Sequence, residues 1–159
     1  MNDSLKSNPD IPPLVANALV GFLGNKNIEI DYSILSLTKT LDSLLNQPLM
    51  REESIVVKVE DAETPFDMPS AFSAYFGQTL ANLYDGQWTG YMDSNSSINF
   101  YSMNLTFGEF SLNPTCWISF RVANGPQEGT VTDWLNRVMP SISARRDLTP
   151  KTGFIEEIY

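Results

Sequence analysis

Histidine is absent from this chain of 159 residues, and cysteine occurs once. Without an imidazole the chain cannot build Ser-His-Asp or Cys-His machinery, because both use histidine as the base. A single cysteine with no histidine also cannot supply the nitrogen and sulfur ligands of a zinc site. The phosphate-binding patterns GxxxxGK[ST] and GxGxxG are missing as well. These absences exclude many catalytic classes, and we expect no cofactor.

The single cysteine, Cys116, excludes an internal disulfide and fits a reducing compartment. Its neighbours Trp117 and Ile118 predict a buried, unreactive thiol. Long hydrophobic runs are also missing, because the longest apolar stretch, Leu14 to Leu23, is too short to span a bilayer. The N-terminus has no positively charged leader followed by an apolar core. We therefore expect a cytoplasmic protein that does not engage a membrane.

Basic residues are scarce, with 10 against 19 acidic residues and a net charge of −9. Nucleic acids and anionic lipids demand positive charge, so neither is an expected partner. Residues 28–110 hold twelve acids and three bases, and the two ends of the chain balance. The whole excess of nine therefore lies in the central stretch. Two interpretations stay open, a solvated acidic surface or an acidic face for a basic protein.

Length and composition predict one globular domain, since 42% of the residues are hydrophobic. We expect a flexible tail over residues 1–10, an α+β domain over 11–140 and a polar tail over 141–159. The apolar residues near the end of that tail can dock on the domain; they are Phe154, Ile155, Ile158 and Tyr159.

Helical spacing predicts four helices, two of them near the N-terminus. The first opens at Pro12 and closes at Gly24, and the second runs from a cap at Ser33 towards Pro48. A third, central helix begins at Asp67 or Ser70 and stops at Gly86; its aromatic stripe predicts core packing. The last runs from Thr130 to Met139, with a capping box at its start and Pro140 as its end. Gly77, inside the central helix, predicts a close helix crossing.

The strands are predicted between these helices. Residues 54–59 are typical of a buried strand, and 60–65 of an acidic loop. Residues 87–92 and 98–101 are expected to pair as a hairpin, followed by a strand over 105–112 with a bulge at Gly108. Residues 114–123 alternate like a strand, yet Asn113, Pro114 and Gly125 favour a helix. The expected fold is α+β, with N-terminal helices, a central helix packed on a small antiparallel sheet, and a C-terminal helix.

Two stretches of the chain carry recognisable patterns. The first is DYSILSLTKTLDSLL over residues 31–45, and the second is AYFGQTL over 74–80, followed by Gly86-Gln-Trp88. They resemble a family of small bacterial domains of unknown function, which has the patterns S-x-x-S-L-x-x-x-L-D, Y-[LF]-G-E and G-x-W. Gln78 replaces the usual glutamate, which favours a structural role over a catalytic one. Some proteins of this kind accompany toxin and secretion loci, so the resemblance implies an immunity protein or an adaptor.

Two kinds of chemistry remain. Carboxylates can act in glycoside hydrolysis or in magnesium or calcium binding, and a Ser-Lys pair is formally possible. The candidates are Glu52 with Glu53, Glu60 with Asp61 and Glu63, and Asp93 in the DSNSS turn. The turn lacks the glycine and final glutamate of a calcium loop. We expect these acids to be solvated, with no metal site and no catalysis.

The same acids, with nearby tyrosines, are the candidate surface for a partner. The candidate residues are Glu52, Glu53, Glu60, Asp61, Glu63, Asp67, Tyr91, Asp93 and Tyr101. We expect a non-catalytic acidic domain that binds a basic protein, most concretely an immunity protein that blocks a toxin. The alternatives are a secretion-associated adaptor or chaperone, and a carboxylate-dependent hydrolase.

Overall fold

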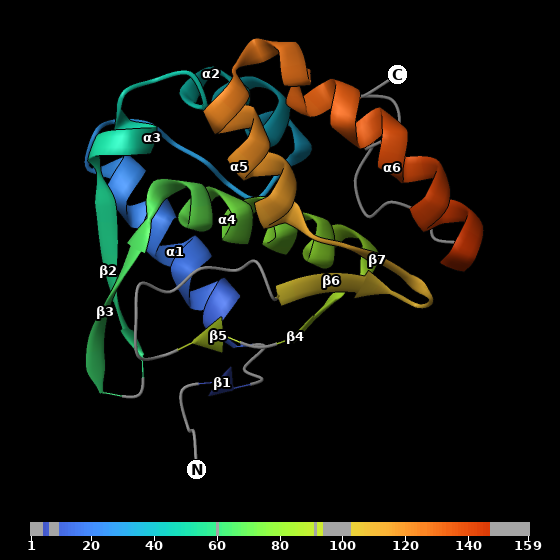
Figure 1. The fold of residues 1–159 in the computed structure, drawn as a ribbon, viewed down its shortest axis with the longest axis horizontal. Coiled ribbons are helices and arrows are strands. Elements are labelled where there is room, and N and C mark those ends of the chain that lie inside the picture. Colours follow the sequence, from blue (N-terminus) through green and yellow to red (C-terminus); the bar gives the residue numbers. More distant parts are fainter. Residues whose placement is uncertain (1–4, 7–9, 60, 91, 94–102, 147–159) are drawn as a thin grey trace.

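The computed structural model describes residues 5–6, 10–59, 61–90, 92–93 and 103–146 (Figure 1). The fold is α+β, as expected. The first half of the chain holds β1 (Leu5–Lys6), α1 (Ile11–Gly24), the π-helical segment η1 (Ser36–Leu41), α2 (Asp42–Leu44), α3 (Leu49–Glu52), β2 (Ser54–Val59), β3 (Ala62–Asp67) and α4 (Met68–Tyr84). The second half holds β4 (Gln87–Gly90), β5 (Met92–Asp93), β6 (Met103–Phe107), β7 (Phe110–Leu112), α5 (Pro114–Asn124), the 3-10 turn η2 (Pro126–Glu128) and α6 (Val131–Arg146).

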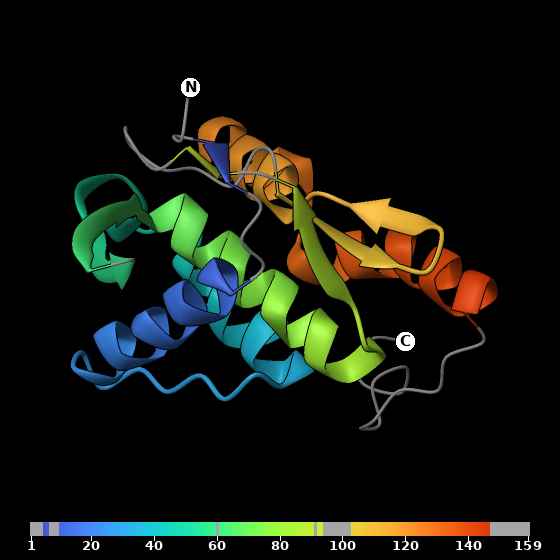
Figure 2. The ribbon, with the colours of Figure 1, turned by 90° about the horizontal axis from the view of Figure 1, so that it is seen from below.

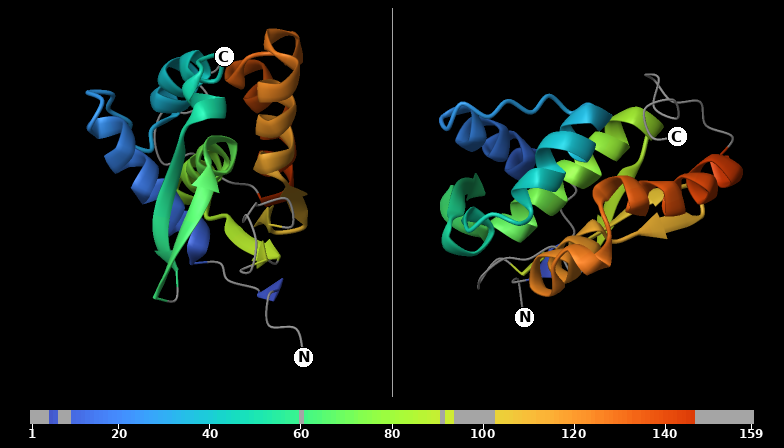
Figure 3. Two further views of the ribbon diagram at one scale, coloured as in Figure 1. Left: turned by 60° about the vertical axis from the view of Figure 1, so that its left-hand side comes forward. Right: turned by 90° about the horizontal axis from the view of Figure 1, so that it is seen from above.

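The central helix α4 runs through the molecule, with α1 on one side and α5 on the other (Figures 2 and 3). Fourteen of its 17 residues are buried, so it is covered nearly all round rather than along one stripe. Its start was predicted at Asp67 or Ser70; Asp67 is the cap, and its Oδ1 accepts from the Ser70 N–H at 2.8 Å. The helix ends at Tyr84, and Asp85 follows in the left-handed conformation with φ 57°.

Gly77 lies against the indole of Trp88, in the strand that follows α4. A Cβ at Gly77 would lie 2.3 Å from Cη2 of Trp88 and 3.3 Å from Cγ of Pro114. The close approach predicted at this glycine is therefore confirmed, but its main partner is a tryptophan on β4 rather than a crossing helix. Trp88 is 6% exposed, and its Nε1 donates to Oε1 of Gln78 at 3.1 Å. Gln78 thus has a structural partner.

The second predicted helix is present, but its middle is wound as a π-helix. Ser33 begins it as predicted, since its Oγ accepts from the Ser36 N–H at 3.1 Å. The buried leucines of this helix belong to the hydrophobic core. At its entry the hydroxyl of Tyr75 accepts from the Tyr32 N–H at 2.7 Å and also hydrogen bonds to the Ser36 hydroxyl. A side chain of α4 therefore anchors the chain where this helix starts.

Strands β2 and β3 form an antiparallel hairpin that packs on α1 and α4 (Figures 1 and 3). The loop predicted over residues 60–65 is wrong, because residues 62–67 pair along the whole length of β2. The prediction followed the polar composition and gave too little weight to Thr64 and Phe66, which suit a strand. β2 is also buried on one face only: Ile55, Val57 and Val59 point inward and alternate with exposed residues.

The second sheet has the order β4-β6-β7, with both pairs antiparallel. The hairpin partner predicted over residues 98–101 lies outside the described residues; β4 pairs with β6, where Trp88 lies opposite Leu105. The bulge predicted at Gly108 is wrong. Phe107 pairs with Phe110, so Gly108, with φ 63°, sits in the tight turn between two strands. In the segment predicted to be a flexible tail, β1 pairs with β5.

Residues 114–124 form helix α5, as the capping signals favoured. Asn113 caps it, with Oδ1 accepting from the Cys116 N–H at 3.0 Å. The buried thiol predicted at Cys116 is wrong, because the residue is exposed. The buried face of this helix carries Pro114, Ile118 and Arg121. Cys116 lies on the opposite face.

Helix α6 begins with the predicted capping box: the Asp133 N–H donates to Thr130 Oγ1 and the Thr130 N–H to Asp133 Oδ2, both at 3.1 Å. These bonds, first that from the backbone N–H of Thr130, hold the pKa of Asp133 below its ordinary value. Asp42, 89 residues earlier, adds a further cap, because its Oδ1 accepts from the Val131 N–H at 2.9 Å. The end predicted at Pro140 is wrong, since the helix continues to Arg146 and buries Ile142.

An aromatic cluster joins α4, α5 and α6. The ring of Phe76 lies 4.9 Å from that of Trp134 and 6.0 Å from that of Trp117, and the two indoles lie 5.4 Å apart. The cluster packs the C-terminal helices onto the central one. Across the described residues, no helix combines the length and the apolarity that a membrane crossing requires.

Candidate functional site

The predicted acidic surface falls on the β2–β3 hairpin and its two ends. Glu52 ends α3 and Glu53 precedes β2, while Asp61 lies in the turn, Glu63 on β3 and Asp67 at the end of β3. All five are exposed. The antiparallel register brings the Glu53 end of β2 beside Asp67, because Ser54 pairs with Asp67. Acids separated by up to 15 positions in sequence therefore lie along the hairpin and at its two ends.

The side of this hairpin that faces away from the helices is a defined surface, which we call the hairpin face. Its cross-strand pairs are Ser54 with Asp67, Val56 with Pro65 and Lys58 with Glu63. Val56 is 58% exposed and Pro65 is exposed beside it. The hairpin face thus has an apolar centre, with an acid towards each end and further acids just beyond. In Figure 1 the hairpin stands at the left edge of the molecule, and its turn projects away from the helices.

Asp61 and Asp67 also have local roles. Asp61 has φ 68°, a left-handed conformation that aspartate tolerates better than most residues. Asp67 caps α4, which leaves its second oxygen for other contacts. Both acids are therefore partly explained by the fold.

The other predicted partner-binding residues are not brought to this face by the described structure. Glu60, Tyr91 and Tyr101 lie outside the described residues. Asp93 belongs to β5, where its backbone pairs with Leu5. Where the chain is described, no three acidic or cysteine side chains come together in a group that could hold a metal ion.

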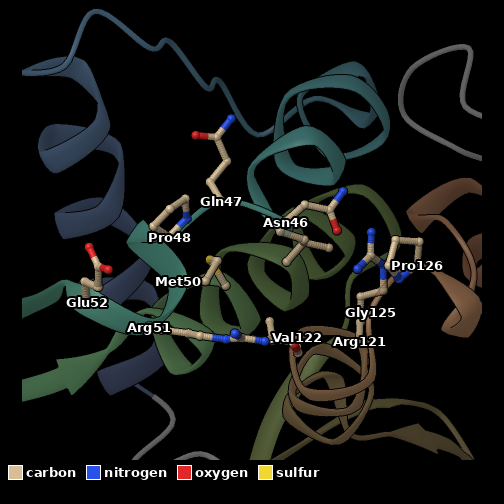
Figure 4. Close-up of a pocket in the computed structure, with 11 residues that line it drawn as sticks. Asn46, Gln47, Pro48, Met50, Arg51, Glu52, Arg121, Val122, Gly125 and Pro126 are labelled. Carbon is tan, nitrogen blue, oxygen red and sulfur yellow. Dashed lines mark hydrogen bonds between the residues drawn. The ribbon is translucent and has the colours of Figure 1, made fainter.

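A second feature was not predicted: a cleft of about 520 Å³ between α3 and α5, which we call the arginine cleft (Figure 4). Two of the ten basic residues of the chain, Arg51 and Arg121, line it. Arg51 reaches across from α3, and its Nη2 donates to the Val122 carbonyl oxygen at 3.2 Å. The rest of the wall is formed by Leu45, Asn46, Gln47, Pro48, Met50, Glu52, Val122, Gly125 and Pro126.

Arg121 is the unusual residue of this cleft, because it is only 3% exposed. Its Nε donates to the Gly129 carbonyl oxygen at 3.1 Å. Its Nη1 is buried and has no hydrogen bond partner within the described part of the chain. The carboxylate of Glu52, which also lines the cleft, points away from both guanidinium groups in Figure 4. A buried guanidinium normally has its donors paired, so this arrangement calls for an explanation.

Sequence reasoning missed the arginine cleft for an identifiable reason. Arg121 is one of few bases in an acidic chain, and this scarcity indicates only that nucleic acid is not an expected partner. The signal was its position: Ile118 and Arg121 are three residues apart and so share the inner face of a helix. A helix at this position therefore places Arg121 on the same face as the apolar Ile118.

A third polar group, away from both surfaces, joins Tyr32 to Tyr75. Their rings lie 4.8 Å apart, and the Tyr32 hydroxyl donates to Asn17 Oδ1 on α1. Burial, and then the charge that an ionised Tyr75 would carry, raises the pKa of Tyr32 to about 12. Burial also raises the pKa of Tyr75. Both hydroxyls therefore stay neutral at physiological pH and hold the loop after α1 in place.

No family model, curated protein or solved structure matches the chain. The resemblance of residues 31–45 and 74–88 to a bacterial domain family stays a prediction.

Proposed function

We propose that this chain is a non-catalytic acidic domain that binds a basic protein through the hairpin face. The observation that carries the proposal is the arrangement of that face. Val56 and Pro65 form an exposed apolar centre, and Glu63 and Asp67 lie on either side of it. Interfaces that bind tightly combine a small apolar anchor with polar groups around it. The hairpin has both elements.

Charge supports a basic partner. The chain carries a net charge of −9, and the stretch that holds the excess includes the whole hairpin. This excess of negative charge speeds association with a positively charged surface and slows association with an acidic one. Lys58 lies opposite Glu63, so the face also offers one position for an acid on the partner.

The concrete form that we propose is an immunity protein that covers the basic active-site cleft of a toxin. Inhibition would be steric, because the turn end of the hairpin projects away from the helices and can enter such a cleft (Figure 1). No catalytic group of this chain is needed. This reading is also consistent with the resemblance to domains found near toxin loci.

The test compares two charge-matched variants in affinity capture from lysate of the source cell. The first, Glu53→Gln with Asp61→Asn and Glu63→Gln, removes three charges at the hairpin. The second, Glu29→Gln with Glu109→Gln and Glu128→Gln, removes three charges elsewhere, so both carry −6. Asparagine at 61 keeps a residue that tolerates positive φ.

We expect one basic protein on the wild-type chain and on the control, and much less of it on the hairpin variant. Binding should weaken at high salt. Val56→Thr, which keeps the branched shape but adds a hydroxyl, should weaken binding without changing the salt dependence. If the purified partner binds both triple variants equally, the hairpin face is not the docking site. Capture of many unrelated unfolded clients would replace the proposal with an adaptor or chaperone.

A further inference from the structure

The arginine cleft has the size and lining of a site for a small molecule. Its volume of about 520 Å³ lies within the range of roughly 300–1,000 Å³ that small-molecule sites occupy. One part of the wall is apolar, from Leu45, Met50 and Val122. Another part carries the guanidinium groups of Arg51 and Arg121. Such a division suits a ligand with an apolar body and one charged group.

The state of Arg121 indicates what that charged group is. Its side chain is almost wholly buried, one edge donates to the Gly129 carbonyl, and Nη1 has no partner in the described part of the chain. An unpaired donor on a buried cation is costly, and an anionic oxygen is its strongest acceptor. Arg51 comes from the opposite wall of the cleft, so α3 and α5 each supply one arginine to its lining (Figure 4).

Both arginines are directed towards the cleft although bases are scarce in this acidic chain. Between residues 28 and 110 Arg51 is one of three bases, and its guanidinium turns into the cleft instead of pairing with the neighbouring Glu52. Arg121 is likewise directed inward, on the buried face of α5. Two separate helices therefore each contribute one cation to the lining of the cleft.

We propose that the arginine cleft binds a small molecule that carries a carboxylate or phosphate group on an apolar body. The guanidinium groups of Arg51 and Arg121 hold the anionic group, Asn46 and Gln47 supply further polar contacts, and Met50 and Val122 contact the apolar body. This site is separate from the hairpin face and does not depend on the function proposed for that face.

The test uses probes that share an apolar ring and differ in the polar group: benzoate, phenyl phosphate and neutral benzamide. Binding to the full-length protein is followed by NMR, through the Nε–H signals of its arginines, and by calorimetry. We expect saturable binding of benzoate or phenyl phosphate, with shifts at Arg51 and Arg121, and no binding of benzamide. The anion that binds more tightly shows whether the charged group of the ligand is a carboxylate or a phosphate.

Substitutions distinguish arginines that bind a ligand from arginines that only stabilise the fold. Arg51→Gln, at an exposed position, should raise the dissociation constant by about tenfold or more, as expected for the loss of a charge-assisted hydrogen bond. Arg137→Gln, a matched exposed arginine on α6, should leave it unchanged. Since Arg121→Gln removes a buried contact and can unfold the chain, Val122→Phe serves as a second variant that fills the cleft and should abolish binding.

The proposal is overturned if neither anionic probe binds saturably, if benzamide binds equally well, or if Arg51→Gln and Arg137→Gln behave alike. In each of these cases Arg121 is a structural residue.

Discussion

Trp88 occupies the space that a side chain at Gly77 would need. A Cβ on Gly77 would lie 2.3 Å from Cη2 and 2.4 Å from Cζ2 of the indole, well inside van der Waals contact. The indole cannot retreat easily, because it is 6% exposed and its Nε1 is bonded to Gln78. The helix α4 and the strand β4 are therefore fitted to each other through this pair.

Gly77→Ala should destabilise the protein although alanine is the better helix former. Overpacking of this kind costs about 1–3 kcal/mol, which exceeds the helix-propensity gain of about 1 kcal/mol. Gly21→Ala, in α1, is the matched control, because a Cβ there meets nothing within 4 Å. It should stabilise the protein by about 0.4–1 kcal/mol. Urea unfolding followed by circular dichroism measures the free energy of unfolding of both variants. If the two substitutions change it equally, the indole of Trp88 moves aside to make room for the Cβ.

Asp42 should stabilise α6 as a cap supplied from another helix. Its Oδ1 accepts from the Val131 N–H at 2.9 Å. Asp42→Ala should lower the free energy of unfolding by about 1 kcal/mol, the usual value of a lost cap. Asp42→Asn keeps an acceptor oxygen and should cost much less. If asparagine costs as much as alanine, the charge near the start of α6 matters more than the hydrogen bond.

Tyr32 should make the fold sensitive to alkaline pH. Its pKa is raised from 10.0 to about 12 in the folded protein. The stabilisation linked to this shift is fully present below about pH 10 and is lost as the pH rises towards 12. Tyr32→Phe removes the titrating hydroxyl. Urea unfolding near pH 9 and near pH 11 should therefore show a larger loss for the wild type than for the variant. Equal losses would assign the alkaline sensitivity to other groups.

Cys116 should react with a thiol reagent in the native state. It is the only cysteine of the chain and is exposed on the outer face of α5. We expect one equivalent of thiol to react with Ellman's reagent without denaturant, at a rate close to that of the unfolded chain. Cys116→Ser gives the blank. A reaction that needs denaturant would mean that the thiol is covered.

The helices were predictable from sequence because their signals are local. Asn113, Asp67 and the pair Thr130 and Asp133 all act as the caps that their spacing indicates. Helix ends were less certain, since Pro140 is accommodated within α6. The aromatic stripe of α4 predicted core packing, but not that its opposite face would be covered as well.

The errors concern features that depend on pairing between distant segments. Residues 62–65, taken alone, have the composition of a loop, and they become part of a strand only through the register with β2. The acids of the candidate surface could be named from sequence, but their grouping around Val56 and Pro65 could not, because that grouping is a product of the register. The cleft beside Arg121 could not be predicted, because its other wall, α3, lies about 70 residues earlier in the chain.

The three tryptophans of the chain all lie beside α4: Trp88 against Gly77, and Trp117 and Trp134 against Phe76. Intrinsic fluorescence will therefore report on the packing around the central helix. The hairpin has no indole, so binding of a partner there should leave the protein's own emission almost unchanged unless the partner brings a fluorophore. An assay of binding at the hairpin therefore needs an added dye, whereas unfolding can be followed by tryptophan emission alone.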